Sequence, residues 1–131
     1  MITRILSAAA IGIALGLSSI SAFAAANDYS FEPVASEMKK GDDVIVTLRL
    51  VHKPSGKLVP DAIVIRKRVD MAPDGMADME SPVEPVTASE PGTYAFKTDL
   101  PMAGRYQFSL AAKVQGEPET VVSKVIIKAV K

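Results

Sequence analysis

Residues 104–114 read Gly-Arg-Tyr-Gln-Phe-Ser-Leu-Ala-Ala-Lys-Val, and this stretch indicates the architecture of the chain most clearly. Its apolar residues recur at every second position: Tyr106, Phe108, Leu110, Ala112 and Val114. A period of two places these side chains on one side of a β-strand, because successive side chains of a strand point to opposite faces. The stretch therefore predicts a strand with one face in a hydrophobic core.

The same alternation recurs on both sides of this strand, between turn signals rich in Gly, Pro and Asp. Residues 40–43 are expected to form one such turn. In the segment 63–71, Ile63, Ile65, Val69 and Met71 share one parity, which predicts a common buried face. The expected strands, besides 106–114, are 29–33, 44–50, 63–71, 83–86, 93–98 and 120–130.

Short strands without a convincing helix indicate an all-β protein. The connections are too short for the helical crossovers that parallel strands need, so the strands should form two packed antiparallel sheets. The segment Gly104-Arg105-Tyr106 resembles the tyrosine corner of immunoglobulin-like domains. We therefore expect an immunoglobulin-like β-sandwich of about seven strands.

The N-terminal residues 1–24 have the layout of a secretory signal peptide. Arg4 precedes an apolar run over 5–20, and Ala22-Phe23-Ala24 supplies small residues for cleavage. The alternative is an uncleaved membrane anchor, for which the run is only marginally long. We expect cleavage after Ala24, a mature domain over 25–131, and a location in the periplasm.

Charge and cysteine content exclude several classes of function. Arg4 is the only charge in the expected signal peptide, so the 15 basic residues fall to 14 against 15 acidic ones, a net charge of −1. This balance does not favour nucleic acid or an anionic membrane as a partner. The chain has no cysteine, which excludes disulfides, thiolate metal sites and a cysteine nucleophile.

Methionine is the residue type that points to a function. Met71, Met76 and Met79 fall in the segment 70–79, whose Pro, Gly and Asp predict an exposed loop, and Met102 lies in a second turn, 100–104. The thioether is a soft, neutral ligand that suits Cu(I). In an immunoglobulin-like strand order both loops lie at the same end of the sandwich, so the four methionines are predicted to form a metal site.

Two of these methionines also suit a purely structural role. Met71 has the parity of a core residue at the end of a strand, and Met102 is placed to plug the end of the sandwich. Asp70, Asp74 and Asp78 lack the ligand spacing of a calcium loop, so they are expected to form turns and hydrogen-bond loop amides.

His52 is the only histidine. It continues the inward parity of the strand 44–50 at the end opposite the methionines, where we expect a half-buried ring whose nitrogens bond a backbone group or water. The alternative is a second site for Cu(II), which imidazole suits. No acid–base pair, nucleophile with a partner, or phosphate-binding loop is visible, so we expect no enzymatic activity.

Several segments together resemble the YtkA-like family, whose domain also occurs in FixH-like proteins. They are residues 52–62, Met76-Ala77-Asp78-Met79, Gly92-Thr93-Tyr94 and 102–106. Glu80-Ser81 stands where that family often has Gly-His, and Tyr106 where it tends to have Trp. The resemblance implies a small secreted β-sandwich associated with heavy-metal efflux or with assembly of copper-containing oxidases.

The leading hypothesis is a periplasmic accessory protein that binds Cu(I), or another soft heavy metal, through Met71, Met76, Met79 and Met102. Its expected partner is a periplasmic or membrane-bound protein of copper transport or oxidase assembly. The alternative is an interaction module without metal, in which exposed methionines form an adaptable apolar patch.

Overall fold

The computed structural model describes residues 26–131, and the expected signal peptide lies outside the described residues. Within this range the regular structure is β-strand with two single turns of 3₁₀ helix, η2 (Ala26–Asp28) and η3 (Ala72–Asp74), and no helix there is long and apolar enough to cross a bilayer. The strands are β1 (Tyr29–Pro33), β2 (Glu37–Lys39), β3 (Gly41–His52), β4 (Lys57–Leu58), β5 (Ile63–Met71), β6 (Met76–Ser81), β7 (Val83–Val86), β8 (Thr93–Leu100), β9 (Gly104–Lys113) and β10 (Val121–Val130).

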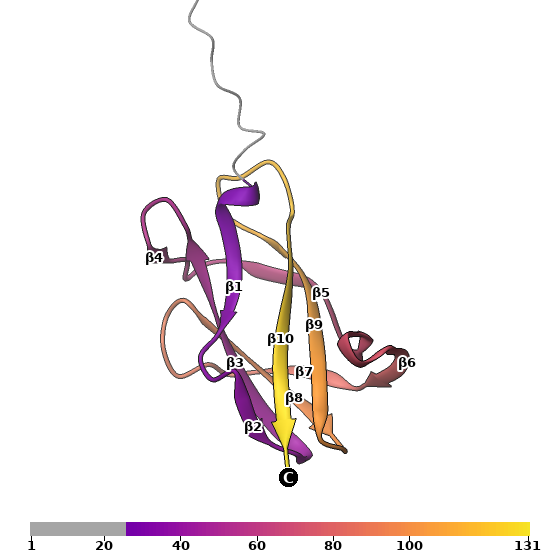
Figure 1. Ribbon diagram of the computed structural model, residues 1–131. Helices are drawn as coiled ribbons and strands as arrows, with labels where there is room; N and C mark the ends of the chain where they lie inside the picture. Colours follow the sequence, from indigo (N-terminus) through magenta and orange to yellow (C-terminus); the bar gives the residue numbers. More distant parts are fainter. Residues whose placement is uncertain (1–25) are drawn as a thin grey trace, which may run out of the picture.

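The strands form two sheets, which confirms the predicted all-β sandwich (Figure 1). One sheet has the order β1-β3-β8-β7, with β4 paired to β3, and the other has the order β2-β10-β9-β5-β6. All neighbours are antiparallel except β2 and β10, which run parallel. The immunoglobulin-like assignment stays a prediction; the order of the longer strands in the two sheets is the one it requires.

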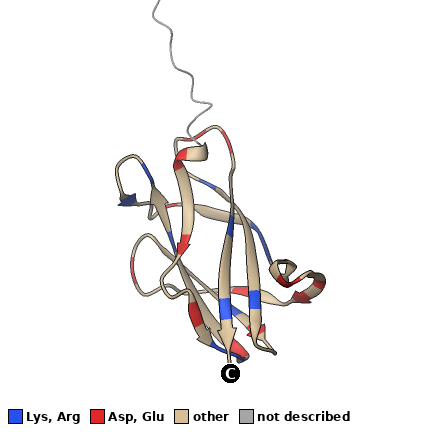
Figure 2. Ribbon diagram, viewed as in Figure 1, with Lys and Arg blue, Asp and Glu red and all other residues tan. Residues whose placement is uncertain are grey.

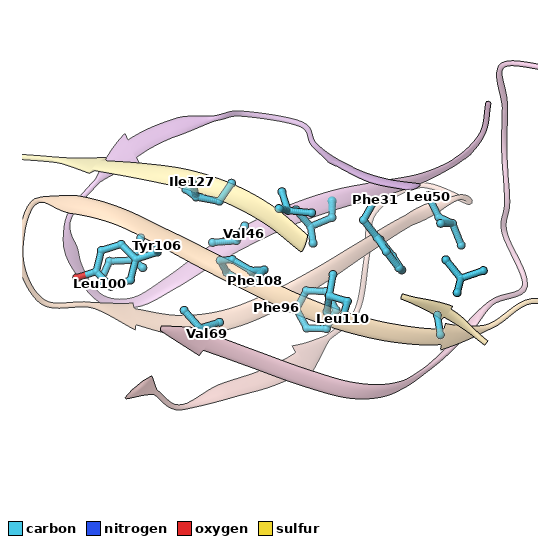
Figure 3. Close-up of a cluster of buried hydrophobic side chains, with 14 of the residues drawn as sticks. Phe31, Val46, Leu50, Val69, Phe96, Leu100, Tyr106, Phe108, Leu110 and Ile127 are labelled. Atoms are coloured by element: carbon cyan, nitrogen blue, oxygen red, sulfur yellow. The ribbon is translucent and has the colours of Figure 1, made fainter. Parts of the chain in front are cut away.

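The core lies between the two sheets, and β9 with the following Val114 supplies its centre (Figure 3). All five of its alternating apolar residues are buried, as predicted. They meet Val46, Leu48 and Leu50 of β3 and Phe96 and Leu100 of β8 within one continuous cluster. Non-directional apolar burial of this kind is the main term that stabilises the sandwich.

The predicted turn over residues 40–43 is wrong. Gly41 already pairs with Leu100, and the register between β3 and β8 shifts before Val44. Asp43 has a positive φ of 52° at this irregularity, and its amide donates to Asp99 Oδ1 at 2.9 Å. The chain therefore forms a β-bulge inside the strand, where the sequence signals of a turn and of a bulge are alike.

The predicted common face of the segment 63–71 is also wrong in its first half. Val69 and Met71 are buried, but Ile63 and Ile65 are exposed. Val64 pairs with Ala112 and Arg66 with Ala111, so Ile65 is an extra residue in β5. One extra residue reverses the side to which all preceding side chains point.

Candidate functional site

The four methionines singled out by the sequence gather around the hairpin of β5 and β6 and the turn between β8 and β9. We call Met71, Met76, Met79 and Met102 the methionine rim. The segment 70–79 is a hairpin and not the predicted irregular loop, since Met71 pairs with Met76 across η3. Gly75 closes the hairpin with φ 77°, and its amide donates to the Ala72 carbonyl at 2.9 Å. A positive φ is what requires glycine at this position.

Arg68 fixes the hairpin from β5. Its guanidinium binds Asp70 Oδ2 at 2.7 Å, Glu80 Oε2 at 2.9 Å and the Ala77 carbonyl at 2.7 Å. Asp70 in turn accepts the Ala72 amide at 2.9 Å with its other oxygen. One side chain thus joins both strands of the hairpin, which restricts the positions of the methionines at its tip.

A second clamp joins the hairpin to the start of β9. The amide and the Nε of Arg105 both donate to the Asp74 carboxylate at 2.8 Å, and Nη2 donates to the Pro73 carbonyl at 2.6 Å. The neighbouring Gly104 has φ 153°, and a Cβ there would lie 2.6 Å from Met71 Cε and 2.8 Å from Asp74 Oδ2. A side chain at this position would displace the ends of the Met71 and Asp74 side chains and would be strained by the positive φ.

Both aspartates of these clamps are stabilised as anions. Burial raises the pKa of Asp70, but the hydrogen bonds from Arg68 and from the Ala72 amide outweigh it, and the net shift is downward. The hydrogen bonds from the amide and then the side chain of Arg105 lower the pKa of Asp74. The expectation that these aspartates hydrogen-bond loop amides is confirmed for both.

The methionines differ in exposure. Met71 belongs to the core and is 1 % exposed, as its parity predicted, whereas Met79 and Met102 are 45 % and 40 % exposed. Met76 is partly buried and packs against the core. The rim therefore has two accessible thioethers at the surface and two that are more enclosed.

A hollow of about 170 Å³ brings part of the rim together. Met71 and Met79 both line it, with Pro101, Tyr106 and Asp78. Met102 follows Pro101, and its backbone is held by the Tyr106 hydroxyl, which donates to the Met102 carbonyl at 2.9 Å and accepts its amide at 3.3 Å. This bond has the form of the predicted tyrosine corner. Met76 does not line the hollow.

The histidine lies at the other end of the sandwich, as predicted. His52 pairs with Tyr29 at one end of β3, whereas Gly41 pairs with Leu100 at the other. Twelve residues of strand separate these ends by about 36 Å. His52 is half-buried, as expected, but its Nδ1 lies 2.7 Å from Ser55 Oγ, a side-chain hydroxyl in place of the expected backbone group or water. In residues 26–131 no group of three His, Cys, Asp or Glu side chains is placed to hold a metal ion.

Sequence reasoning did not identify Arg68, Arg105 and Tyr106 as the residues that order the rim. Tyr106 carried a signal, the tyrosine-corner motif, but was assigned only to the fold. Arg68 and Arg105 look like ordinary solvent-facing strand residues in the sequence, because their partners come from other segments. The contacts of these three residues explain how a Pro- and Gly-rich segment keeps one conformation.

Comparisons with known proteins were made in sequence and in structure. A sequence model of the YtkA-like family matches residues 23–111. A search of curated proteins found no significant match. Among solved structures, one titled ZirS C-terminal Domain aligns with 98% of this chain and 83% of its own, with a TM-score of 0.46 and 13% sequence identity.

Proposed function

This chain belongs to the YtkA-like family, and we propose that it is a periplasmic accessory protein of copper handling that binds Cu(I) through the methionine rim. The partner would be a copper-transport or oxidase-assembly protein, in line with the resemblance to YtkA-like and FixH-like domains. No enzymatic step is part of this proposal.

The observation that carries the proposal is the hollow shared by Met71 and Met79. Met71 and Met79 line it from paired strands together with Asp78 and Glu80, and the turn that bears Met102 adjoins it through Pro101. Neutral sulfur donors suit a soft monovalent ion and discriminate against hard cations such as Mg²⁺ and Ca²⁺. The two methionines therefore suit Cu(I), whereas the carboxylates of Asp78 and Glu80 in the same lining are harder ligands. Ag(I), which is also soft, should compete.

The proposed roles follow from exposure. Met79 and Met102 are accessible, so they would capture the ion and release it to a partner. Met71 would complete the site from the core side, and Met76, opposite Met71 in the hairpin, would contribute if the hairpin tip adjusts. A site built mainly of neutral thioethers near the surface favours exchange over permanent storage.

A competition titration with a Cu(I) chelator under reducing conditions tests the proposal. Met79→Leu and Met102→Leu keep the apolar volume and remove the sulfur, so they should cost little stability, within about 1.5 kcal/mol. We expect each to weaken Cu(I) binding by about tenfold or more. Met38→Leu is the matched control, since Met38 lies on β2 outside the rim. Unchanged affinity in both rim variants would contradict the proposal.

The metal-free interaction module is the second candidate, and the exposure of Met79 and Met102 favours it. Both side chains offer a flexible apolar contact to a partner. The same leucine variants separate the two functions, because leucine preserves an apolar patch but not a thioether site. Partner capture that survives Met→Leu and is lost with Met→Ser would support the module over the metal site.

A further inference from the structure

The outward face of the sheet β10-β9-β5 has an unusual composition. An antiparallel sheet face that meets water is normally polar. On β10 the outward residues alternate between apolar and cationic: Val122, Lys124, Ile126 and Lys128, none of them buried. Val122 is 71 % exposed, and no packing within the described residues accounts for an apolar side chain there.

The register extends this pattern into rows across the sheet. Val122 lies opposite Ala111, which lies opposite Arg66. In the next row, Lys124 lies opposite Ser109, which lies opposite Arg68. Figure 2 shows blue segments on β5, β9 and β10, whereas red segments gather at the hairpin of η3 and β6.

A hollow of about 270 Å³ lies on this face, and its lining residues include Arg66, Arg68, Ser109, Ala111, Val122 and Lys124. No carboxylate lines it. Engineered apolar cavities of about 150 Å³ admit benzene, so this hollow has room for an apolar side chain. Apolar side chains, Ala111 and Val122, lie here between cationic ones. This arrangement favours a ligand that combines an apolar group with negative charge.

Four of the six cations on this face form no ion pair among the described residues, although the Asp70 carboxylate, which Arg68 holds, attracts Lys124 through space. Arg68 and Arg105 form ion pairs at the hairpin. In the described part of the chain, the other cations on the outward parity make no ion pair: Arg66, Lys113, Lys124 and Lys128. Their mutual repulsion would be relieved by an anionic occupant.

We propose that this basic sheet face docks an acidic segment of a partner protein, with carboxylates at Arg66 and Lys124 and one apolar side chain in the hollow beside Val122. A protein segment suits the concave site better than a bilayer does, because no aromatic side chain projects from the outward positions of these rows to anchor in a headgroup layer. The proposal does not depend on Cu(I) binding, since none of the rim methionines lines this hollow.

Fluorescence anisotropy with a labelled peptide that alternates Glu and Leu tests the proposal on the purified protein. Its Gln–Leu and Glu–Ser counterparts separate the charge from the apolar group. The wild type should bind the Glu–Leu peptide most tightly, and added salt should weaken that binding. The double variant Arg66→Glu, Lys124→Glu should weaken it by about tenfold or more.

The matched control for charge is Lys53→Glu, Lys57→Glu, which makes the same charge change on either side of the turn between β3 and β4. For the apolar contact, Val122→Ser should weaken binding, whereas Ile45→Ser, an equally simple change at an exposed residue of the other sheet, should not. Circular dichroism would confirm that each variant is folded.

Three outcomes would overturn the proposal. The first is no difference between the Glu–Leu and Gln–Leu peptides, and the second is equal loss in the control and test variants. The third is selective binding to phosphatidylglycerol vesicles, lost in the Arg66→Glu, Lys124→Glu variant, without peptide binding. That result would assign the face to a membrane surface instead.

Discussion

The two ends of the sandwich are held together by different chemistry. At the methionine rim, guanidinium groups bind carboxylates: Arg68 with Asp70 and Glu80, and Arg105 with Asp74. At the opposite end, the bonds come mostly from phenol and hydroxyl groups, including Tyr94 to the Val59 carbonyl at 2.6 Å and His52 to Ser55. These ion pairs hold the irregular backbone of the rim in one conformation. They also make its stability depend on the ionisation of the carboxylates.

The largest effect should come from Gly104→Ala, at the closest approach in the rim. The new Cβ would meet Met71 and the Asp74 carboxylate that Arg105 holds, so the clamp must shift. We expect a loss of about 2–3 kcal/mol in the free energy of unfolding, measured with urea. Gly116→Ala is the control: it has a positive φ but open space around it, so about 1 kcal/mol is expected. Equal losses would show that the close approach contributes nothing.

A pair of tyrosine variants compares the ends directly. Tyr106→Phe removes the hydroxyl that holds Met102, and Tyr94→Phe removes the one that binds Val59 and Ala62. Each should cost about 1 kcal/mol of stability. Only Tyr106→Phe should also weaken Cu(I) binding in the chelator titration, because Tyr94 lies far from the rim. If both variants changed the Cu(I) affinity equally, the tyrosine corner would have no specific role in the proposed site.

The ends should also respond to opposite extremes of pH. The pKa values of Asp70 and Asp74 are lowered in the fold, so their contribution is present above the ordinary value of 3.8 and is lost as pH falls below it. Burial raises the pKa values of Tyr29 and Tyr94, the former also through Glu117, so their contribution is present below 10.0 and is lost as pH rises.

Urea unfolding from about pH 2 to about pH 11 measures both limbs. Asp74→Asn should reduce the loss of stability at acid pH, and Tyr94→Phe should reduce the loss at alkaline pH. If each variant changed the free energy of unfolding equally at acid and at alkaline pH, the two ends would not differ in the proposed way.

The smallest effect is expected at the histidine. Because His52 lies at the end of β3 opposite Gly41, whose partner Leu100 adjoins the turn that bears Met102, His52→Ala should leave Cu(I) affinity within about threefold of the wild type. Chelator competition measures this, with Met79→Leu as the positive control. A tenfold loss, about 1.4 kcal/mol, in a folded variant would place the imidazole in the site.

The sequence predicted the sandwich well where a side chain's environment follows directly from its parity. The alternation from Tyr106 to Val114 needs no partner to be interpreted, and it placed the core on the correct face. The bulge at Ile65 could not be predicted, because no residue type marks it and the pairing with Ala111 and Ala112 decides it. The residues before the bulge therefore lie on the face opposite to the predicted one.

The four methionines stay a predicted metal site, and the local structure of the segment 70–79 differs from the expected loop. Pro73 and Gly75 were correctly interpreted as breaking regular structure, but pairing resumes at Met76. The residues that hold it, Arg68 and Arg105, have partners from separate segments of the chain, and local sequence patterns contain no such information. The strand order predicted that the methionines lie at one end, but only the three-dimensional arrangement shows that Met71 and Met79 share a hollow that Met76 and Met102 do not line.

X-ray absorption spectroscopy of the Cu(I)-loaded protein would identify the donor atoms, and so would show whether the methionine rim is a copper site. We expect one bound Cu(I) with a coordination shell dominated by sulfur, and a loss of sulfur scattering in a Met79→Leu, Met102→Leu double variant. All sulfur in this protein is methionine, so such a shell can only be thioether. A shell of nitrogen and oxygen alone, or no stoichiometric uptake, would contradict copper binding by the methionine rim.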